Sequence, residues 1–173
     1  CKPTEAVLNG LIEKSLKLFE SALGPVEVRK ELDPRIDTVF VDPDQMQRVF
    51  VNLLDNSLEA MVDQATDRIV TIRTQFNAGR QSVTIEFADT GHGIQADDYE
   101  HLFLPYFSTK RKGTGLGLAI VRQVITEHSG FVRAEPNVPQ GTKVLIEIPV
   151  DGSREFFARL GERENHESKT PSS

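Results

Sequence analysis

The sequence predicts an α/β sandwich, in which a mixed, largely antiparallel sheet is covered on one face by about three helices. Three observations lead to this prediction. Apolar residues recur at helical spacing in residues 5–23, 42–61 and 116–128. Apolar and polar residues alternate in residues 70–76 and 83–87, as in half-buried strands. The length of 173 residues suits one domain with a core that needs no disulfide bonds.

The beginning of the chain predicts one helix and two strands. The helical pattern of residues 5–23 ends at Gly24 and Pro25, which interrupt regular structure. Residues 26–32 then predict a strand, and residues 38–41 predict a second, shorter one.

The next helix has a clear start. Asp42 is a favourable N-cap, Pro43 occupies the first helical position, and Gln45 completes an Asp-x-x-Gln capping box. A core-facing stripe follows, made of Met46, Val49, Phe50, Leu53, Leu54 and Met61.

The rest of the chain predicts a hairpin, a helix and two further strands. Residues 77–80 form a plausible turn between the two alternating strands, which predicts antiparallel pairing. After the helix over residues 116–128, strands are expected at residues 131–134 and 144–148. Residues 161–173 contain no large apolar side chain, so we expect them to be disordered.

Composition excludes several classes of protein. The net charge of -6 argues against a nucleic-acid partner. The single cysteine, Cys1, excludes a disulfide framework and fits a reducing compartment. No apolar run is long enough to span a membrane, so we expect this part of the protein to be cytoplasmic and free of membrane contact. That expectation leaves an inner-membrane parent open.

Two asparagines lie on the capped helix. Asn52, Asn56 and Glu59 are spaced i, i+4 and i+7, so they share one side of it. That side is either a solvated polar face or a source of hard amide oxygens for Mg²⁺.

A glycine-containing segment, residues 89–94, follows a predicted strand. Either it is a plain strand-to-loop turn, or Asp89 accepts a hydrogen bond from an exocyclic amine while the glycines allow close approach of a ligand. Gly91, Gly93 and Ala96 also fit a dinucleotide fingerprint. That fingerprint needs an acidic residue about 20 positions on. Residues 101–126 contain none, so we reject a dinucleotide-binding site.

Two further features favour an anion. Lys110, Arg111 and Lys112 lie within the acid-free stretch, which fits a triphosphate better than a solvated loop. Residues 113–118 are glycine-rich and lead into a helix, where backbone N–H groups bind phosphate, although no Walker A sequence is present.

Taken in order, these segments resemble the catalytic domain of sensor histidine kinases. The resemblance covers roughly residues 26–149. It comprises an N box at 52–56, a first glycine box at 89–94, an F box at 102–110, a second glycine box at 113–118 and a small motif at 141–144. The F box ending and the sequence after the N box are similar to the nitrogen-regulation (NtrB- and NtrY-like) group.

The resemblance implies the Bergerat-type ATP-binding fold, with its left-handed connections, and Mg-ATP as ligand. Asp89 would bond to the adenine amine, and Thr142 would contact the adenine from below. Asn56, with Asn52 nearby, would hold Mg²⁺, and Lys110 would reach a terminal phosphate. The implied catalytic residues are therefore Asn52, Asn56 and Lys110.

The segment 95–114 would be a mobile lid anchored by Phe103 and Phe107. The other implied ATP-binding residues are Gly91, Gly93, Ile94, Ser108, Thr109, Gly113, Thr114, Gly115, Leu116, Gly117 and Leu118. Two residues depart from the family pattern: Glu59 replaces a frequent basic residue, and Leu104 replaces a frequent glutamate.

The resemblance also implies an organisation and partners. Residues 1–24 would be a helical linker from a missing dimerisation and phosphoacceptor domain, 25–150 the ATP-binding domain, and 151–173 a polar tail. A response regulator would act downstream. None of the four histidines has the sequence context of a phosphoacceptor, so this chain is not expected to autophosphorylate alone.

Three functions remain open. Superfamily hydrolases carry a glutamate base four residues before the metal-binding asparagine, and that position here is Asn52. A histidine acceptor needs no base, so phosphoryl transfer to histidine is favoured over ATP hydrolysis. A non-catalytic, pseudokinase-like nucleotide-binding module is the remaining alternative.

Overall fold

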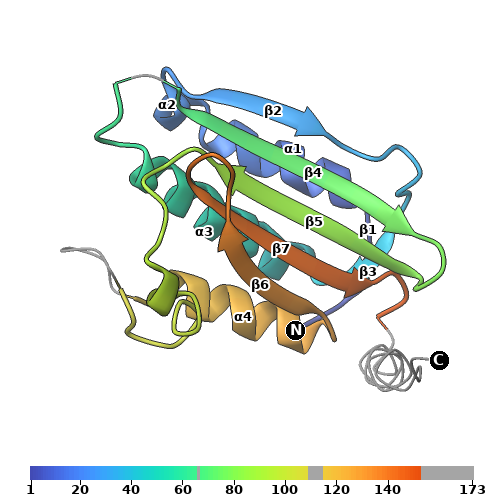
Figure 1. Cartoon of the computed structure of the whole chain (residues 1–173). Helices are drawn as coiled ribbons and strands as arrows, with labels where there is room; N and C mark the ends of the chain where they lie inside the picture. Colours follow the sequence, from blue (N-terminus) through green and yellow to red (C-terminus); the bar gives the residue numbers. More distant parts are fainter. Residues whose placement is uncertain (66, 109–114, 153–173) are drawn as a thin grey trace, which may run out of the picture.

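Figure 1 shows the computed structural model of the chain, which describes residues 1–65, 67–108 and 115–152. The expected disordered segment 161–173 lies outside the described residues. The strands are β1 (Thr4–Ala6), β2 (Glu27–Glu31), β3 (Val39–Val41), β4 (Ile69–Asn77), β5 (Ser82–Asp89), β6 (Phe131–Pro136) and β7 (Thr142–Pro149). The helices are α1 (Leu8–Leu18), α2 (Glu20–Leu23), α3 (Pro43–Ala60), α4 (Gly117–Glu127) and the 3-10 helix η1 (Ala96–Asp98).

Five strands form the main sheet in the order β2-β4-β5-β7-β6. β2 runs parallel to β4, and the other neighbours are antiparallel. Helices α1, α3 and α4 cover one face of this sheet, and the other face is open (Figure 1). The predicted sandwich, with its mixed and largely antiparallel sheet, is therefore confirmed.

The alternation of side chains explains why only one face is covered. On β4 and β5, Val70, Ile72, Val83 and Ile85 point to the helices and are fully buried. Between them on the open face, Arg73 forms ion pairs with glutamates of the neighbouring strands β2 and β5. A face lined by paired charges is stable in water, so it needs no second layer of helices.

The predicted cap of α3 is confirmed in one half only. Asp42 Oδ1 accepts the main-chain N–H groups of Asp44 and Gln45, each at 3.1 Å. The reciprocal bond, in which the Asp42 N–H would donate to the Gln45 side-chain oxygen, is not made, because the Asp42 N–H donates to His128 Nε2 at 2.9 Å. The Gln45 side-chain nitrogen donates to Glu127.

The N-terminal region differs from the single helix expected over residues 5–23. Strand β1 pairs with β3 in a separate two-stranded sheet, and the helix begins only at Leu8. Leu8, Ile12 and Leu16 of α1 are buried in the common core. Residues 1–24 thus fold against the domain, and their role as a link to a dimerisation domain stays a prediction.

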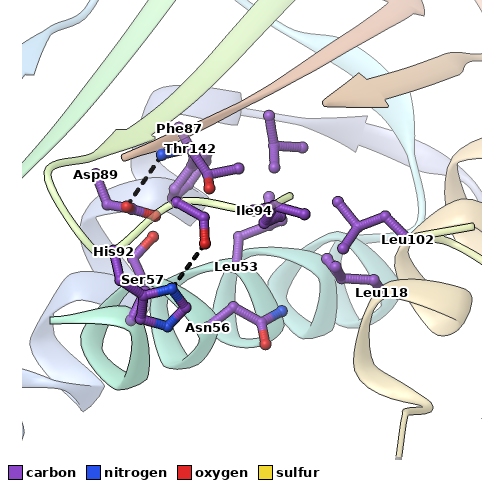
Figure 2. Close-up of a pocket in the computed structure, with 13 residues that line it drawn as sticks. Leu53, Asn56, Ser57, Phe87, Asp89, His92, Ile94, Leu102, Leu118 and Thr142 are labelled. Atoms are coloured by element: carbon purple, nitrogen blue, oxygen red, sulfur yellow. Dashed lines mark hydrogen bonds between the residues drawn. The ribbon is translucent and has the colours of Figure 1, made fainter. Parts of the chain in front are cut away.

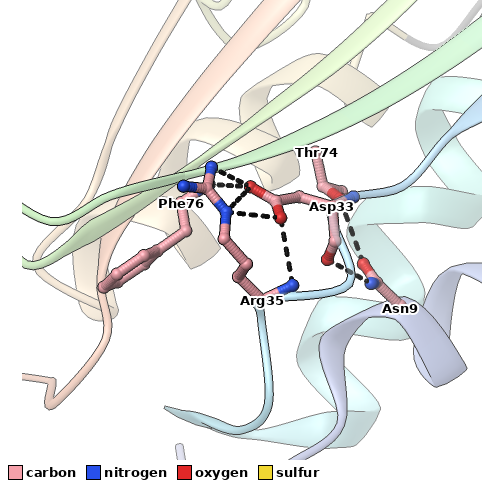
Figure 3. Close-up of polar contacts among 5 residues, drawn as sticks. All are labelled: Asn9, Asp33, Arg35, Thr74 and Phe76. Atoms are coloured by element: carbon pink, nitrogen blue, oxygen red, sulfur yellow. Dashed lines mark hydrogen bonds and ion pairs between the residues drawn. The ribbon is translucent and has the colours of Figure 1, made fainter.

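A polar cluster fixes the loop after β2 to α1 and β4 (Figure 3). The Asp33 carboxylate accepts the main-chain N–H of Phe76 at 2.9 Å and pairs with the Arg35 guanidinium at 2.7 Å. Thr74 Oγ1 accepts the Asp33 N–H at 2.9 Å and donates to Asn9 at 3.1 Å.

In the described part of the chain, no helix is long and apolar enough to cross a membrane.

Candidate nucleotide site

A hollow lies between α3, the loop after β5, the start of α4 and the beginning of β7 (Figure 2), and its empty space, together with the open solvent at its entrance, is about 590 Å³. Its apolar lining consists of Leu53, Phe87, Ile94, Leu102, Leu118 and Val144. The polar side chains of Asn56, Ser57, Asp89, His92 and Thr142 also line it. A mainly apolar hollow with a few convergent polar groups is typical of a small-molecule site.

Asp89 lines the hollow and is only 6% exposed. Its Oδ1 accepts the main-chain N–H groups of Gly91 at 2.9 Å and Thr142 at 3.2 Å. Desolvation raises the pKa of Asp89, while hydrogen bonds from Gly91, Thr142 and the Ser57 hydroxyl act in the opposite direction. A buried carboxylate held in this way can recognise an amine of a bound base.

The first glycine loop rests on the last turn of α3. The His92 N–H donates to the Ala60 carbonyl at 3.1 Å. A Cβ on Gly91 would lie 2.6 Å from Ala60 Cβ, so only glycine fits there. This close packing brings Asp89 and Asn56 of α3 into the lining of one hollow.

Asn52 and Asn56 face the start of α4. A Cβ on Gly117 would lie 3.0 Å from Asn52 Oδ1 and 3.9 Å from Asn56 Nδ2. The Asn52 amide nitrogen donates to the Arg48 carbonyl at 2.9 Å, which leaves its oxygen toward Gly117. Asn52 thus presents an amide oxygen beside a helix N-terminus, which suits a hard cation bound together with phosphate, whereas the Asn56 atom near Gly117 is the amide nitrogen. Glu59 is exposed and does not line the hollow.

The F box contacts the second glycine box through Tyr106 and Gly115. The Tyr106 N–H donates to the Gly115 carbonyl at 3.0 Å. Gly115 has φ +69°, and a Cβ there would lie 2.5 Å from the Tyr106 carbonyl carbon, so glycine is required. Phe103 packs against the core, and the Phe107 ring lies 5.9 Å from that of His101.

The structure brings most of the predicted site residues together. Six of them line the hollow directly: Asn56, Asp89, Gly93, Ile94, Leu118 and Thr142. Five others lie next to it in the contacts given above or in the same loop: Asn52, Gly91, Gly115, Leu116 and Gly117. Phe103, Phe107 and Ser108 are described but do not line it. Thr109, Lys110, Gly113 and Thr114 lie outside the described residues.

Sequence reasoning passed over two polar residues near Asp89. Ser57 follows Asn56 and lies one helical turn after the core residue Leu53, so a helical projection could have found it. Tyr99 interacts with the Thr142 side chain, and its pKa is raised, first by desolvation and then by the nearby Asp89 charge. No pattern in the sequence indicates Tyr99.

Curated relatives match most of this chain. Sensor histidine kinase ZraS of Klebsiella oxytoca is 32% identical over 149 residues, 85% of this chain and 31% of its own length. Sensor protein FixL of Bradyrhizobium diazoefficiens is 39% identical over 144 residues, 82% of this chain and 28% of its own. Sensory histidine kinase/phosphatase NtrB of Rhodobacter capsulatus is 36% identical over 129 residues, 70% of this chain and 36% of its own. The chain thus spans about a third of these relatives, and they do not single out one subgroup.

Solved structures and a family model agree with these relatives. The catalytic domain of histidine kinase ThkA has a TM-score of 0.79 and 30% identity, covering 89% of this chain and 99% of that domain. ThkA in complex with response regulator protein TrrA matches with a TM-score of 0.74 and 27% identity, covering 87% of this chain and 42% of that one. The model of the histidine kinase-, DNA gyrase B-, and HSP90-like ATPases matches residues 41–152. The chain therefore belongs to this ATPase family, and within it to the catalytic ATPase domain of histidine kinases.

Proposed function

We propose that this chain binds Mg-ATP and transfers the γ-phosphoryl group to a histidine on a separate dimerisation domain of a two-component sensor kinase. One observation supports this most strongly. The hollow is lined by a buried carboxylate, Asp89, and by the amide of Asn56, and the amide of Asn52 lies next to it, facing Gly117 at the start of α4. The carboxylate suits a base with an amino group, and the amides beside α4 suit phosphates with their metal ion.

The adenine is held by shape and by one charged acceptor. Its 6-amino group donates to Asp89, which backbone N–H groups of Gly91 and Thr142 hold in place. The apolar lining excludes water from the two faces of the ring. A base without an amino group at this position would leave the buried carboxylate unsatisfied.

The phosphates lie between the N box and the N-terminus of α4. Asn52 and Asn56 would hold Mg²⁺, which when bound offsets negative charge on the phosphates. The N–H groups at Gly117 and Leu118 begin α4, where the helix dipole favours an anion. We assign Lys110 the terminal phosphate contact, on the basis of the F box sequence.

The acceptor would be a neutral imidazole nitrogen. Its lone pair attacks the γ-phosphorus, the bond to the β,γ-bridging oxygen breaks, and ADP leaves. The phosphorylated ring then loses its other proton to solvent. Because the lone pair is already available, no general base is needed, which fits Asn52 at the position where hydrolases of the superfamily have a glutamate.

The partners are also a proposal. The ThkA complex with the response regulator TrrA supports a receiver protein as the downstream partner of the parent kinase. We place the parent in the nitrogen-regulation group, on the F box ending at Ser108-Thr109-Lys110 and the similarity to NtrB. Phosphotransfer to receivers of that group, compared with receivers of other groups, would test this placement.

Two measurements test the proposed function. Calorimetry should show Mg-ATP binding, and ATP at about 100 times its dissociation constant should stabilise the chain by about 2.7 kcal/mol. The chain, mixed with a dimerisation domain and γ-labelled ATP, should then produce acid-labile phosphohistidine on that domain. Binding without transfer would favour the pseudokinase-like module. Phosphate release without the acceptor domain would favour an ATPase.

A further inference from the structure

The turn between β6 and β7, residues 137–141, contacts the loop that carries Asp89. We infer that Asn137 and Gln140 in this turn are positioning residues that determine how selectively the site recognises the amino group of the base. The inference rests on the proposed nucleotide site and extends it to residues that do not line the hollow.

Two side-chain amides of the turn bond to the first glycine loop. Asn137 Nδ2 donates to the main-chain carbonyl of Asp89 at 2.8 Å. Gln140 Nε2 donates to the main-chain carbonyl of Gly91 at 3.0 Å. These carbonyls flank Thr90, so the two amides fix the backbone on both sides of it.

The last residue of this turn and Thr142, the first residue of β7, also hold Asp89 through their backbone. The Thr142 N–H donates to the Asp89 carboxylate at 3.2 Å. Gly141 has φ +109°, and a Cβ there would lie 1.9 Å from the Asp89 carbonyl oxygen, so the two backbones are in close contact. The main chain of Asp89 is therefore positioned by the β6–β7 turn, and its carboxylate by the residue that follows the turn.

The local role of Asn137 can be separated from its role toward Asp89. Its Oδ1 accepts the Val138 N–H at 3.1 Å, a bond within the turn, while its Nδ2 donates to Asp89. Asn137→Asp retains an oxygen for Val138 and removes the donor to Asp89. Gln140→Glu likewise removes only the donor, and Gln140 is an exposed side chain whose replacement leaves the core intact.

The test compares two nucleotides that differ only in the amino group. Calorimetry would give the dissociation constants of Mg-ATP and of the Mg complex of purine ribonucleoside triphosphate, which lacks the 6-amino group. In the unmodified chain we expect ATP to bind about 10- to 100-fold more tightly, as for a hydrogen bond to a charged group. In N137D and Q140E this preference should fall several-fold. The added charge weakens both triphosphates alike, so it cancels in the ratio.

The control is Gln81→Glu. Gln81 Nε2 donates to the Ala78 carbonyl at 2.9 Å, which is the same kind of bond in the β4–β5 turn at the far end of the sheet. Q81E should retain the full preference. Equal losses for both nucleotides in N137D and Q140E would show that the turn is merely structural and would overturn the inference, as would an unchanged preference.

Three further outcomes are distinguishable. If N137D unfolds, Gln140→Ala at the exposed position removes one donor without adding charge, and an unchanged preference in Q140A would overturn the inference. If the unmodified chain binds neither nucleotide, the proposed function itself is wrong and the inference fails with it. If it binds both equally, Asp89 does not recognise the amino group, and the inference fails while nucleotide binding stands.

Discussion

The Asp42 N–H donates to His128 Nε2 across 2.9 Å, in a buried contact between the start of α3 and the end of α4. His128 Nδ1 lies 2.7 Å from the Val124 carbonyl oxygen. A carbonyl can only accept, so Nδ1 carries the proton, Nε2 is the acceptor, and the ring is neutral. Both helices also line the nucleotide site, through Asn56 on α3 and Leu118 on α4. This contact therefore fixes the relative position of the two helices.

Replacing His128 with alanine should destabilise the domain. The buried Asp42 N–H would lose its acceptor, which lowers the free energy of unfolding by about 1–3 kcal/mol. Urea denaturation followed by circular dichroism measures the change. His101→Ala is the control, because His101 is an exposed histidine whose loss should change the free energy by less than about 0.5 kcal/mol. Equal effects of the two variants would show that the Asp42 contact contributes little.

Asp89→Asn should stabilise the free chain and weaken nucleotide binding. The pKa of Asp89 is raised by burial, so its contribution to stability is largest below the unfolded-state pKa and decreases as pH rises through the folded-state pKa. Asparagine retains the oxygen that accepts from Gly91 and Thr142. At pH 7 we expect a gain of about 0.5–2 kcal/mol, together with about 10- to 100-fold weaker Mg-ATP binding.

The pH dependence supplies the check on Asp89. The stability gain of D89N should shrink as pH falls and the carboxyl of the unmodified chain becomes neutral, since the two side chains then carry the same charge. Denaturation at several pH values, with the exposed Asp97→Asn as control, measures this. A D89N chain that is less stable at pH 7 would mean that the hydrogen bonds of the carboxylate outweigh its desolvation.

Asp33→Asn should lower the stability of the free chain at pH 7, the opposite of the effect expected for Asp89→Asn. The Arg35 guanidinium, together with the N–H groups of Phe76 and Arg35, holds the pKa of Asp33 well below its usual range. Its contribution to stability is therefore present above the unfolded-state pKa and is lost as pH falls toward the folded-state pKa. In D33N the amide nitrogen would face a donor in either orientation, the Phe76 N–H or the Arg35 N–H, so the variant should unfold at lower urea at pH 7, unlike the exposed Asp37→Asn. A constant difference from pH 7 to pH 3 would contradict this account.

The sequence predicted α3 well because its signals are local. A cap at Asp42 and a stripe from Met46 to Leu54 need no knowledge of the rest of the chain, and the helix begins and continues as expected. Strand β1 was missed because three residues are too short for an alternation pattern, and its pairing with β3 depends on tertiary packing.

The sequence predicted the separate motifs of the candidate site better than the contacts between them. Asp89 and the glycine boxes stand out as motifs, whereas the contact of Asp89 with Thr142 depends on the antiparallel register that pairs Ala88 with Lys143. No periodicity indicates that Asn137 and Gln140 reach the same loop, because both belong to a turn. Contacts made by single side chains across the sheet leave no pattern in the sequence.

Asn52→Glu should raise the rate at which the chain hydrolyses ATP. Asn52 Oδ1 faces Gly117 at the start of α4, where we propose that the phosphates bind, so a carboxylate there could take a proton from an attacking water molecule. A positioned general base typically contributes about 10²–10⁴-fold, and we expect phosphate release from ATP to rise at least about 10-fold. Asn52→Gln, which has the length of glutamate without its basicity, is the matched control. Similar phosphate release from N52E and N52Q would show that the missing base does not separate the two activities.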